Sequence, residues 1–265
     1  MAVRIEQQGA VMTVIHSRAE ARNAMDPASA DALAEAFERF DADASAHVAV
    51  LWGEGGAFCA GFDLKYAASM RGDQPLEHLD FPVGGGKPSR GGLGPTRLEL
   101  SKPVIAAVAG PAVAGGMELA LWCDIRIMEE DAYFGVYCRR WGVPLLDGGT
   151  MRLPRLVGQG RALEIILTGR KVHAEECLGI GACEKVVAHG ESRAAAEAMA
   201  HEIARFPQIC VRADRASVYR TYGAPTREAL RLEWEHGQEA LVTEAAAGAS
   251  RFAAGKGRHG NFEDI

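Results

Sequence analysis

One carboxylate stands alone on an apolar segment that directly follows a pair of glycines. The segment runs Gly-Gly-Met-Glu-Leu-Ala-Leu-Trp from Gly115 to Trp122, and Glu118 is its only charged residue. Burying an ionised carboxylate is costly, so such a placement commonly serves proton transfer. A helix that begins at the glycine pair also presents unpaired N–H groups to negative charge. This pattern predicts an acid/base group beside a polarised carbonyl. The alternative is a first-turn glutamate that only complements the helix dipole.

A second glycine-rich stretch, at residues 53–64, could supply another backbone donor. Its small residues, among them Ala57, Cys59, Ala60 and Gly61, let the main chain approach a ligand closely. With Gly115, this gives two separate strand ends that each offer a main-chain N–H group. Two such donors aimed at one oxygen form an oxyanion hole.

Short apolar runs must position these two stretches. The runs lie at residues 11–15, 47–52, 104–109, 125–128 and 185–187, and they have the length and composition of strands. Asp26 and Pro27 favour the start of a helix, and later segments at 192–205, 211–222 and 226–251 are also expected to be helical, with Ser192 and Thr226 as N-caps. Apolar strands alternating with helices predict an α/β fold whose sheet is buried on both faces.

Composition narrows the classes of function. The 265-residue chain has a net charge of −6, which argues against a nucleic-acid surface. Its six cysteines are scattered and its eight histidines form no metal-binding pattern, so we expect reduced thiols and no metal. The N-terminus lacks the apolar region of a secretory signal, and no apolar run is long enough to span a bilayer. We therefore expect a cytoplasmic protein that binds neither nucleic acid nor membrane.

Several short motifs follow one another in a fixed order along the chain. They are A-F-C-A-G-F-D-L at 57–64, K-P-V-I-A-A-V-A-G-P-A-V-A-G-G-M-E-L-A-L at 102–121, C-D-I-R-I at 123–127, Y-F-G at 133–135, G-G-T-M-R-L-P-R-L-V-G at 148–158 and L-T-G-R at 167–170. In these motifs the chain resembles the crotonase (enoyl-CoA hydratase/isomerase) superfamily. The resemblance runs in order from about residue 11 to residue 187, and two of its motifs at this spacing are far more specific than a lone glycine-rich loop.

The resemblance implies a spiral of strand–strand–helix (ββα) units followed by a C-terminal helical region that builds trimers, commonly paired into hexamers. We accordingly expect a core with the CoA-ester site at residues 1–195 and a helical trimerisation region at residues 196–265. The substrate would be an acyl-CoA thioester, and no cofactor would be needed beyond the CoA that the substrate carries.

The family's site residues can be carried over by position. Ala60 and Gly115 match the two backbone donors that hold the thioester oxygen. Glu118 matches the first of two glutamates that activate water and move protons in hydratases. The stretch along the CoA pantetheine and adenine comprises Ala60, Gly61, Phe62, Asp63 and Leu64. The loop that closes on the nucleotide end matches residues 18–24, which include Arg22. Trp141, Phe62 and Met117 are candidates for the acyl pocket, although large apolar residues more often form core.

Two positions depart from the hydratase pattern. The second glutamate should fall at residue 138, where this chain has Cys138. That thiol is either partly ionised by the two arginines after it or a small buried side chain in the substrate site. Asp147 matches a catalytic aspartate of a related dienoyl-CoA isomerase branch, so a Glu118/Asp147 pair could replace the hydratase pair. The alternative for Asp147 is the N-cap of a helix that begins near Gly148.

We expect an enzyme of the enoyl-CoA hydratase type, which adds water to 2-enoyl-CoA thioesters of fatty or short acyl groups. Two N–H donors would stabilise the enolate and Glu118 would move the proton. The alternatives are an enoyl- or dienoyl-CoA isomerase that uses Glu118 and Asp147, a hydrolase or decarboxylase, and an acyl-CoA-binding relative with little or no catalysis.

Overall fold

The computed structural model describes residues 2–70, 79–82, 84–86 and 88–257. Its strands are β1 (Val3–Gln8), β2 (Val11–His16), β3 (Val48–Gly53), β4 (Val104–Val108), β5 (Pro111–Val113), β6 (Ile125–Glu129), β7 (Tyr133–Gly135), β8 (Lys171–His173) and β9 (Lys185–Val187). Its α-helices are α1 (Pro27–Ala42), α2 (Leu64–Ser69), α4 (Gly115–Trp122), α5 (Gly149–Val157), α6 (Gln159–Thr168), α7 (Ala174–Ile180), α8 (Ser192–Ala204), α9 (Gln208–Thr221), α10 (Thr226–Thr243) and α11 (Ala245–Ala253). Three 3₁₀ helices complete the described elements, η1 (Ala19–Ala21), η2 (Pro95–Arg97) and η3 (Tyr137–Trp141).

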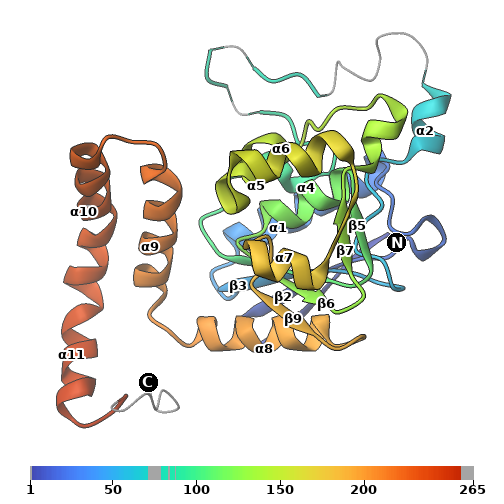
Figure 1. Cartoon of the computed structure of the whole chain (residues 1–265). Helices are drawn as coiled ribbons and strands as arrows, with labels where there is room; N and C mark the ends of the chain where they lie inside the picture. The colour runs from blue at the N-terminus through green and yellow to red at the C-terminus, as the bar shows by residue number, and fades with distance from the viewer. Residues whose placement is uncertain (1, 71–78, 83, 87, 258–265) are drawn as a thin grey trace.

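The larger sheet is buried on both faces, as the apolar runs predict. Its strand order is β1-β2-β3-β4-β6-β9, and all neighbours are parallel except the antiparallel β1–β2 pair. Side chains alternate along β3, so that Ala49 and Leu51 join the core toward α1 and α4, whereas Val48 and Val50 pack toward α8. Figure 1 shows α8 on one side of this sheet and α1 and α4 on the other.

A second, shorter ladder gives the chain its spiral. Strands β5, β7 and β8 form a small sheet, and isolated bridges join Met25 to Phe62 and Cys59 to Ala112. The chain thus repeats one turn several times: a strand in the large sheet, a short extended segment in this ladder, and a helix. The units β4–β5–α4 and β3–Cys59–α2 are two such turns. The expected ββα spiral is confirmed.

The predicted core strands and the helix that begins at Pro27 are confirmed within a residue or two. Asp26 caps α1 by accepting a hydrogen bond from the Ser29 amide at 2.8 Å. The predicted N-caps Ser192 and Thr226 are wrong, because each is already the first residue of its helix. The helix expected over residues 226–251 is two helices, α10 and α11.

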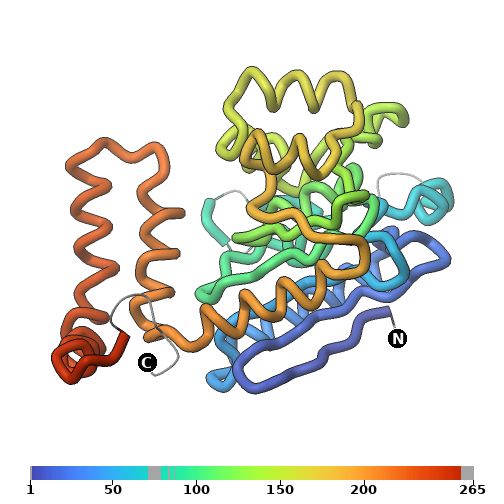
Figure 2. Tube along the Cα trace, turned by 60° about the horizontal axis from the view of Figure 1, so that its bottom comes forward, coloured from blue at the N-terminus to red at the C-terminus, as the bar shows by residue number. Residues whose placement is uncertain are grey.

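Beyond α8, the chain leaves the core as an arm of three helices, α9, α10 and α11 (Figures 1 and 2). Asp124, just after α4, anchors this arm: it accepts hydrogen bonds from Arg215 at 2.9 Å and from the Tyr219 hydroxyl at 2.6 Å, both on α9. The expected division at residue 195 falls inside α8, whose Ala196 and Ala200 pack on the large sheet.

All six cysteines are free thiols, and only Cys210 is exposed. Among the described residues, no helix has both the length and the apolar character needed to cross a bilayer. The cytoplasmic location stays a prediction.

Candidate functional site

The N-terminus of α4 is shaped by an unusual backbone conformation at Ala114. This residue has φ 54° and ψ −123°, which a side chain disfavours by about 1–3 kcal/mol. Its amide is fixed by a hydrogen bond to the Gly135 carbonyl at 2.7 Å. The reversal lets α4 begin at Gly115, whose N–H group has no acceptor within the described part of the chain. A free backbone donor therefore sits where the sequence predicts one.

Glu118 lies one helical turn further on and is 2% exposed. Its Oε1 accepts hydrogen bonds from the amides of Asp147 at 2.9 Å and Gly149 at 2.8 Å. Burial raises the pKa of Glu118 to about 7; the Gly149 hydrogen bond opposes the rise, and the nearby Asp147 charge adds to it. The carboxylate thus binds a loop from outside its own helix and is poised to exchange a proton near neutral pH, which the helix-dipole alternative does not explain.

The glycines after Asp147 make room for this arrangement. A Cβ atom at Gly149 would lie 2.9 Å from Glu118 Cγ and 3.0 Å from Oε1. Gly148 has φ 98°, and the Arg152 guanidinium occupies the space that a side chain there would need. The two glycines after Asp147 therefore let the loop place the Asp147 and Gly149 amides against Glu118.

Asp147 is buried and its carboxylate is already engaged. Its Oδ1 accepts a hydrogen bond from the Leu93 amide at 3.1 Å and another from the Thr96 hydroxyl. The alternative interpretation of Asp147 as a helix N-cap is wrong. The N-cap of α5 is Gly148, and no side chain caps the start of this helix.

Cys138, on η3, is a buried thiol near Glu118. Burial raises the pKa of Cys138 and the Glu118 charge raises it further, while Arg139 lowers it less. The hypothesis that the arginines partly ionise this thiol is therefore wrong. A neutral thiol stands where the hydratase pattern has its second glutamate.

The assignment of Ala60 as a backbone donor is contradicted. Its amide donates to the Arg22 carbonyl at 3.1 Å, so it is not free to bind an oxyanion. In the same segment, Met25 donates to Gly61 and accepts from Asp63. Met25 and Phe62 are therefore partners in a parallel bridge. In such a bridge Met25 bonds to the residues on either side of Phe62, so the N–H group of Phe62 points away from Met25. The Phe62 amide has no acceptor in the described ranges.

Phe62 and Gly115 lie on neighbouring segments. A Cβ atom at Gly61 would approach the Gly115 amide nitrogen to 3.1 Å and the Ala114 methyl group to 3.0 Å. The approach at Gly116 is closer still, since a Cβ atom there would lie 2.0 Å from the Cys59 carbonyl oxygen. Two unpaired amides and one buried carboxylate therefore gather around the first turn of α4, an arrangement able to stabilise an enolate and move its proton.

The remaining predicted binding residues differ in their surroundings. Asp63 caps α2 through the Lys65 amide at 2.9 Å and pairs with Arg18 at 3.1 Å. Arg22 is exposed and adopts a left-handed backbone conformation. Leu64 is 44% exposed.

Two of the acyl-pocket candidates differ in burial. Met117 is fully buried in the core, as the alternative for large apolar residues states. Trp141 is 67% exposed, and its place in an acyl pocket stays a prediction.

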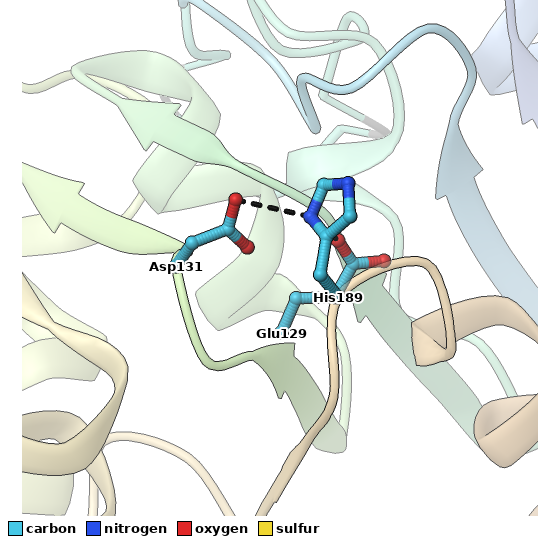
Figure 3. A group of neighbouring side chains, drawn as sticks. All are labelled: Glu129, Asp131 and His189. Carbon is cyan, nitrogen blue, oxygen red and sulfur yellow. Dashed lines mark hydrogen bonds and ion pairs between the residues drawn. The ribbon is translucent and has the colours of Figure 1, made fainter.

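Away from this site, Glu129, Asp131 and His189 bring three potential metal-ligand atoms together, a cluster that the sequence did not reveal (Figure 3). His189 Nδ1 lies 3.0 Å from Asp131 and 3.4 Å from Glu129. The other Glu129 oxygen accepts a hydrogen bond from the Ser192 hydroxyl at 2.7 Å. These contacts fix the start of α8, at Ser192, to the end of β6, at Glu129. They explain the cluster without a metal ion.

Comparison with known proteins places this geometry in a family. The family model described as enoyl-CoA hydratase/isomerase matches residues 6–257. Enoyl-CoA hydratase EchA19 of Mycobacterium tuberculosis is 32% identical over 267 residues, covering 98% of this chain and 96% of the relative. Carnitinyl-CoA dehydratase of Proteus mirabilis is 37% identical over 213 residues, covering 80% of this chain and 77% of the relative.

Solved structures agree with these relatives. The crystal structure of enoyl-CoA hydratase EchA1 from Mycobacterium marinum matches with a TM-score of 0.85 and 32% identity, covering 96% of each chain. The enoyl-CoA hydratase from Bacillus anthracis matches with a TM-score of 0.87 and 29% identity, covering 96% of this chain and 97% of that one. The chain therefore belongs to the enoyl-CoA hydratase/isomerase family, within the crotonase superfamily.

Proposed function

We propose that this protein is a hydratase-type lyase that adds water to 2-enoyl-CoA thioesters or removes it from the hydrated product. The observation that carries the proposal is the buried Glu118, with a pKa of about 7, one turn after the unpaired Gly115 amide. The similar proteins, which are named as hydratases and a dehydratase, support the same proposal.

In the proposed reaction, the thioester oxygen accepts hydrogen bonds from the amides of Phe62 and Gly115. Ionised Glu118 takes a proton from water while the water oxygen bonds to the β-carbon, and the electron pair moves onto the thioester oxygen. Glu118 then returns the proton to the α-carbon, so that one water is added in total. Removing one such oxyanion donor typically costs about 3–4 kcal/mol in the transition state. The chemistry needs a carboxylate and backbone donors, so we propose no cofactor beyond the CoA of the substrate.

A second candidate is isomerisation of an enoyl-CoA, favoured by the shortage of free carboxylates. Cys138 is held as a neutral thiol, and the Asp147 carboxylate already accepts two hydrogen bonds. Glu118 alone can remove a proton at the α-carbon and return it at the γ-carbon, which shifts the double bond without water.

Replacing Glu118 by Gln tests this assignment. We expect the rate of hydration of crotonyl-CoA and longer 2-enoyl-CoAs to fall by about 10²–10⁴-fold, because the proton acceptor is lost while its hydrogen-bonded position is kept. In the wild type, kcat/KM should rise with pH through about 7, since the ionised carboxylate is the active form. The measurement is the loss of thioester absorbance with identification of the product.

The same screen separates the candidates. A gain of conjugated-thioester absorbance from 3-enoyl-CoA, without hydration, favours the isomerase. Full hydratase activity in Glu118→Gln, or no turnover of any enoyl-, dienoyl- or hydroxyacyl-CoA by the wild type, contradicts the proposed lyase.

Alanine substitutions at two separate glycines test whether the loop of residues 147–149 positions Glu118. Gly149→Ala should lower kcat by about 10²-fold, because its methyl group displaces the carboxylate, and small misplacements near reacting atoms have effects of this size. Gly160→Ala is the matched control, since a Cβ atom on this α6 glycine would meet nothing within 4 Å. Equal activity in the two variants would show that Glu118 does not depend on this loop for its position.

We further propose that the chain assembles as a homotrimer or a hexamer through its helical arm. Large apolar side chains are exposed there, among them Trp234 at 61% and Val242 at 83%. Sedimentation should give a multiple of 28.3 kDa, about 85 kDa for a trimer (3 × 28.3) or twice that for a hexamer. Trp234→Glu combined with Val242→Glu should dissociate the assembly, whereas Gln8→Glu on the exposed part of β1 should not. A monomeric wild type would refute the assembly.

A further inference from the structure

The tight turn formed by residues 91–97 lies against the first turn of α4. Gly91 and Gly94 close the turn with paired backbone hydrogen bonds of 2.9 and 3.0 Å. Leu93, between them, is 2% exposed. Its side chain covers Gly115 so closely that a Cβ atom there would lie 2.4 Å from Leu93 Cδ2. Leu93 is therefore a direct neighbour of the proposed oxyanion donor.

Asp147 joins this turn to the loop that holds Glu118. Its carboxylate accepts hydrogen bonds from Leu93 and Thr96, whereas its own amide donates to Glu118 Oε1 at 2.9 Å. Arg152, on α5, closes the connection by donating to the Asp147 carbonyl and to the Thr96 carbonyl, each at 2.8 Å. Four hydrogen bonds thus clamp the turn to the loop.

The clamp acts on a single face of α4. Gly115 and Glu118 are three residues apart, so they lie on the same side of the helix. Leu93 packs over the first, and the Asp147–Gly149 loop binds the second. An acyl group whose carbonyl is held at Gly115 and whose α- and β-carbons are near Glu118 must pass beside Leu93.

We propose that Asp147 is a positioning residue that seats Leu93 as a wall of the acyl site, and that Leu93 determines which acyl groups fit there. The inference rests on the proposed function in one respect, that an acyl-CoA is the ligand. Asp147 does not serve as a second proton-transfer group, because its carboxylate faces the turn and is occupied by the Leu93 amide and the Thr96 hydroxyl.

The decisive experiment compares binding of saturated acyl-CoAs, short, long and α-methyl-branched, by calorimetry. Leu93→Ala should raise the affinity for the branched or long ligand relative to the short one by about tenfold, a typical value for a few methylenes in an apolar site. Thr96→Val, which removes the hydroxyl bonded to Asp147, should shift the same ratio in the same direction. Thr96→Ser, which keeps the hydroxyl, should restore the wild-type ratio.

Substitutions of Asp147 separate positioning from proton transfer. Asn offers an oxygen that can accept the same two hydrogen bonds, so Asp147→Asn should keep the ligand ratio near that of the wild type, whereas Asp147→Ala should shift it as Leu93→Ala does. The Asn variant should also move the pH dependence of kcat/KM to lower pH. Among the described residues, the charged and titratable groups close enough to act on the Glu118 charge are the Asp147 carboxylate, the Cys138 thiol and the Arg152 guanidinium, and only the first changes in this variant.

Three results would overturn the inference. One is a uniform change in affinity for all ligands in Leu93→Ala, and another is identical ligand ratios in Thr96→Val and Thr96→Ser. The third is a loss of turnover in Asp147→Asn as large as in Glu118→Gln. The binding series needs no turnover, so an inactive wild type refutes the proposed lyase and isomerase activities while the ligand ratios still decide the role of Leu93.

Discussion

The site depends on one interaction, the pair of hydrogen bonds from the Asp147 and Gly149 amides to the buried carboxylate of Glu118. A rise of pKa from 4.5 to about 7 corresponds to about 3 kcal/mol in favour of the protonated form. Each hydrogen bond to a charged group contributes about 1.5–3 kcal/mol, so the two amides offset much of the desolvation. The balance leaves a carboxyl group that can gain or lose a proton near neutral pH, as a group that both takes and returns a proton must.

Much of the surrounding structure exists to keep this balance. Gly149 lacks a side chain because Glu118 fills its space, and Ala114 accepts a strained backbone so that α4 can begin beside it. The two carboxylates of the region are used differently. Within the described residues, Glu118 accepts its hydrogen bonds from backbone amides, whereas the Asp147 carboxylate is turned toward the Leu93–Thr96 turn. The division explains how two nearby acids can differ in function.

The sequence predicted the fold and the main carboxylate but not the details of their partners. Apolar runs located the core strands, because burial on both faces leaves nearly continuous apolar stretches, and Asp26 with Pro27 located the start of α1. Glu118 stood out as a lone charge on an apolar helix. Ala60 was assigned by its position in the motif, and the sequence does not show which segment pairs with residues 60–63. The hydrogen bonds to Arg22 and Met25 reveal that the Phe62 amide is the free one. Asp147 forms hydrogen bonds with Thr96, which lies 51 positions earlier in the chain, and with Leu93, which lies 54 positions earlier. No local sequence pattern could reveal contacts between residues so far apart in the chain.

The most direct test of this account is a titration of the Glu118 side chain itself. Carbon-13 NMR of the carboxyl groups, with the Glu118→Gln variant to assign the resonance, gives its midpoint in the free protein. We expect a midpoint near pH 7, because burial and the Asp147 charge raise the pKa of Glu118 while the two loop amides lower it. A midpoint near the ordinary value of 4.5 would mean that the carboxylate is hydrated, and the proposed acid/base chemistry would lose its physical basis.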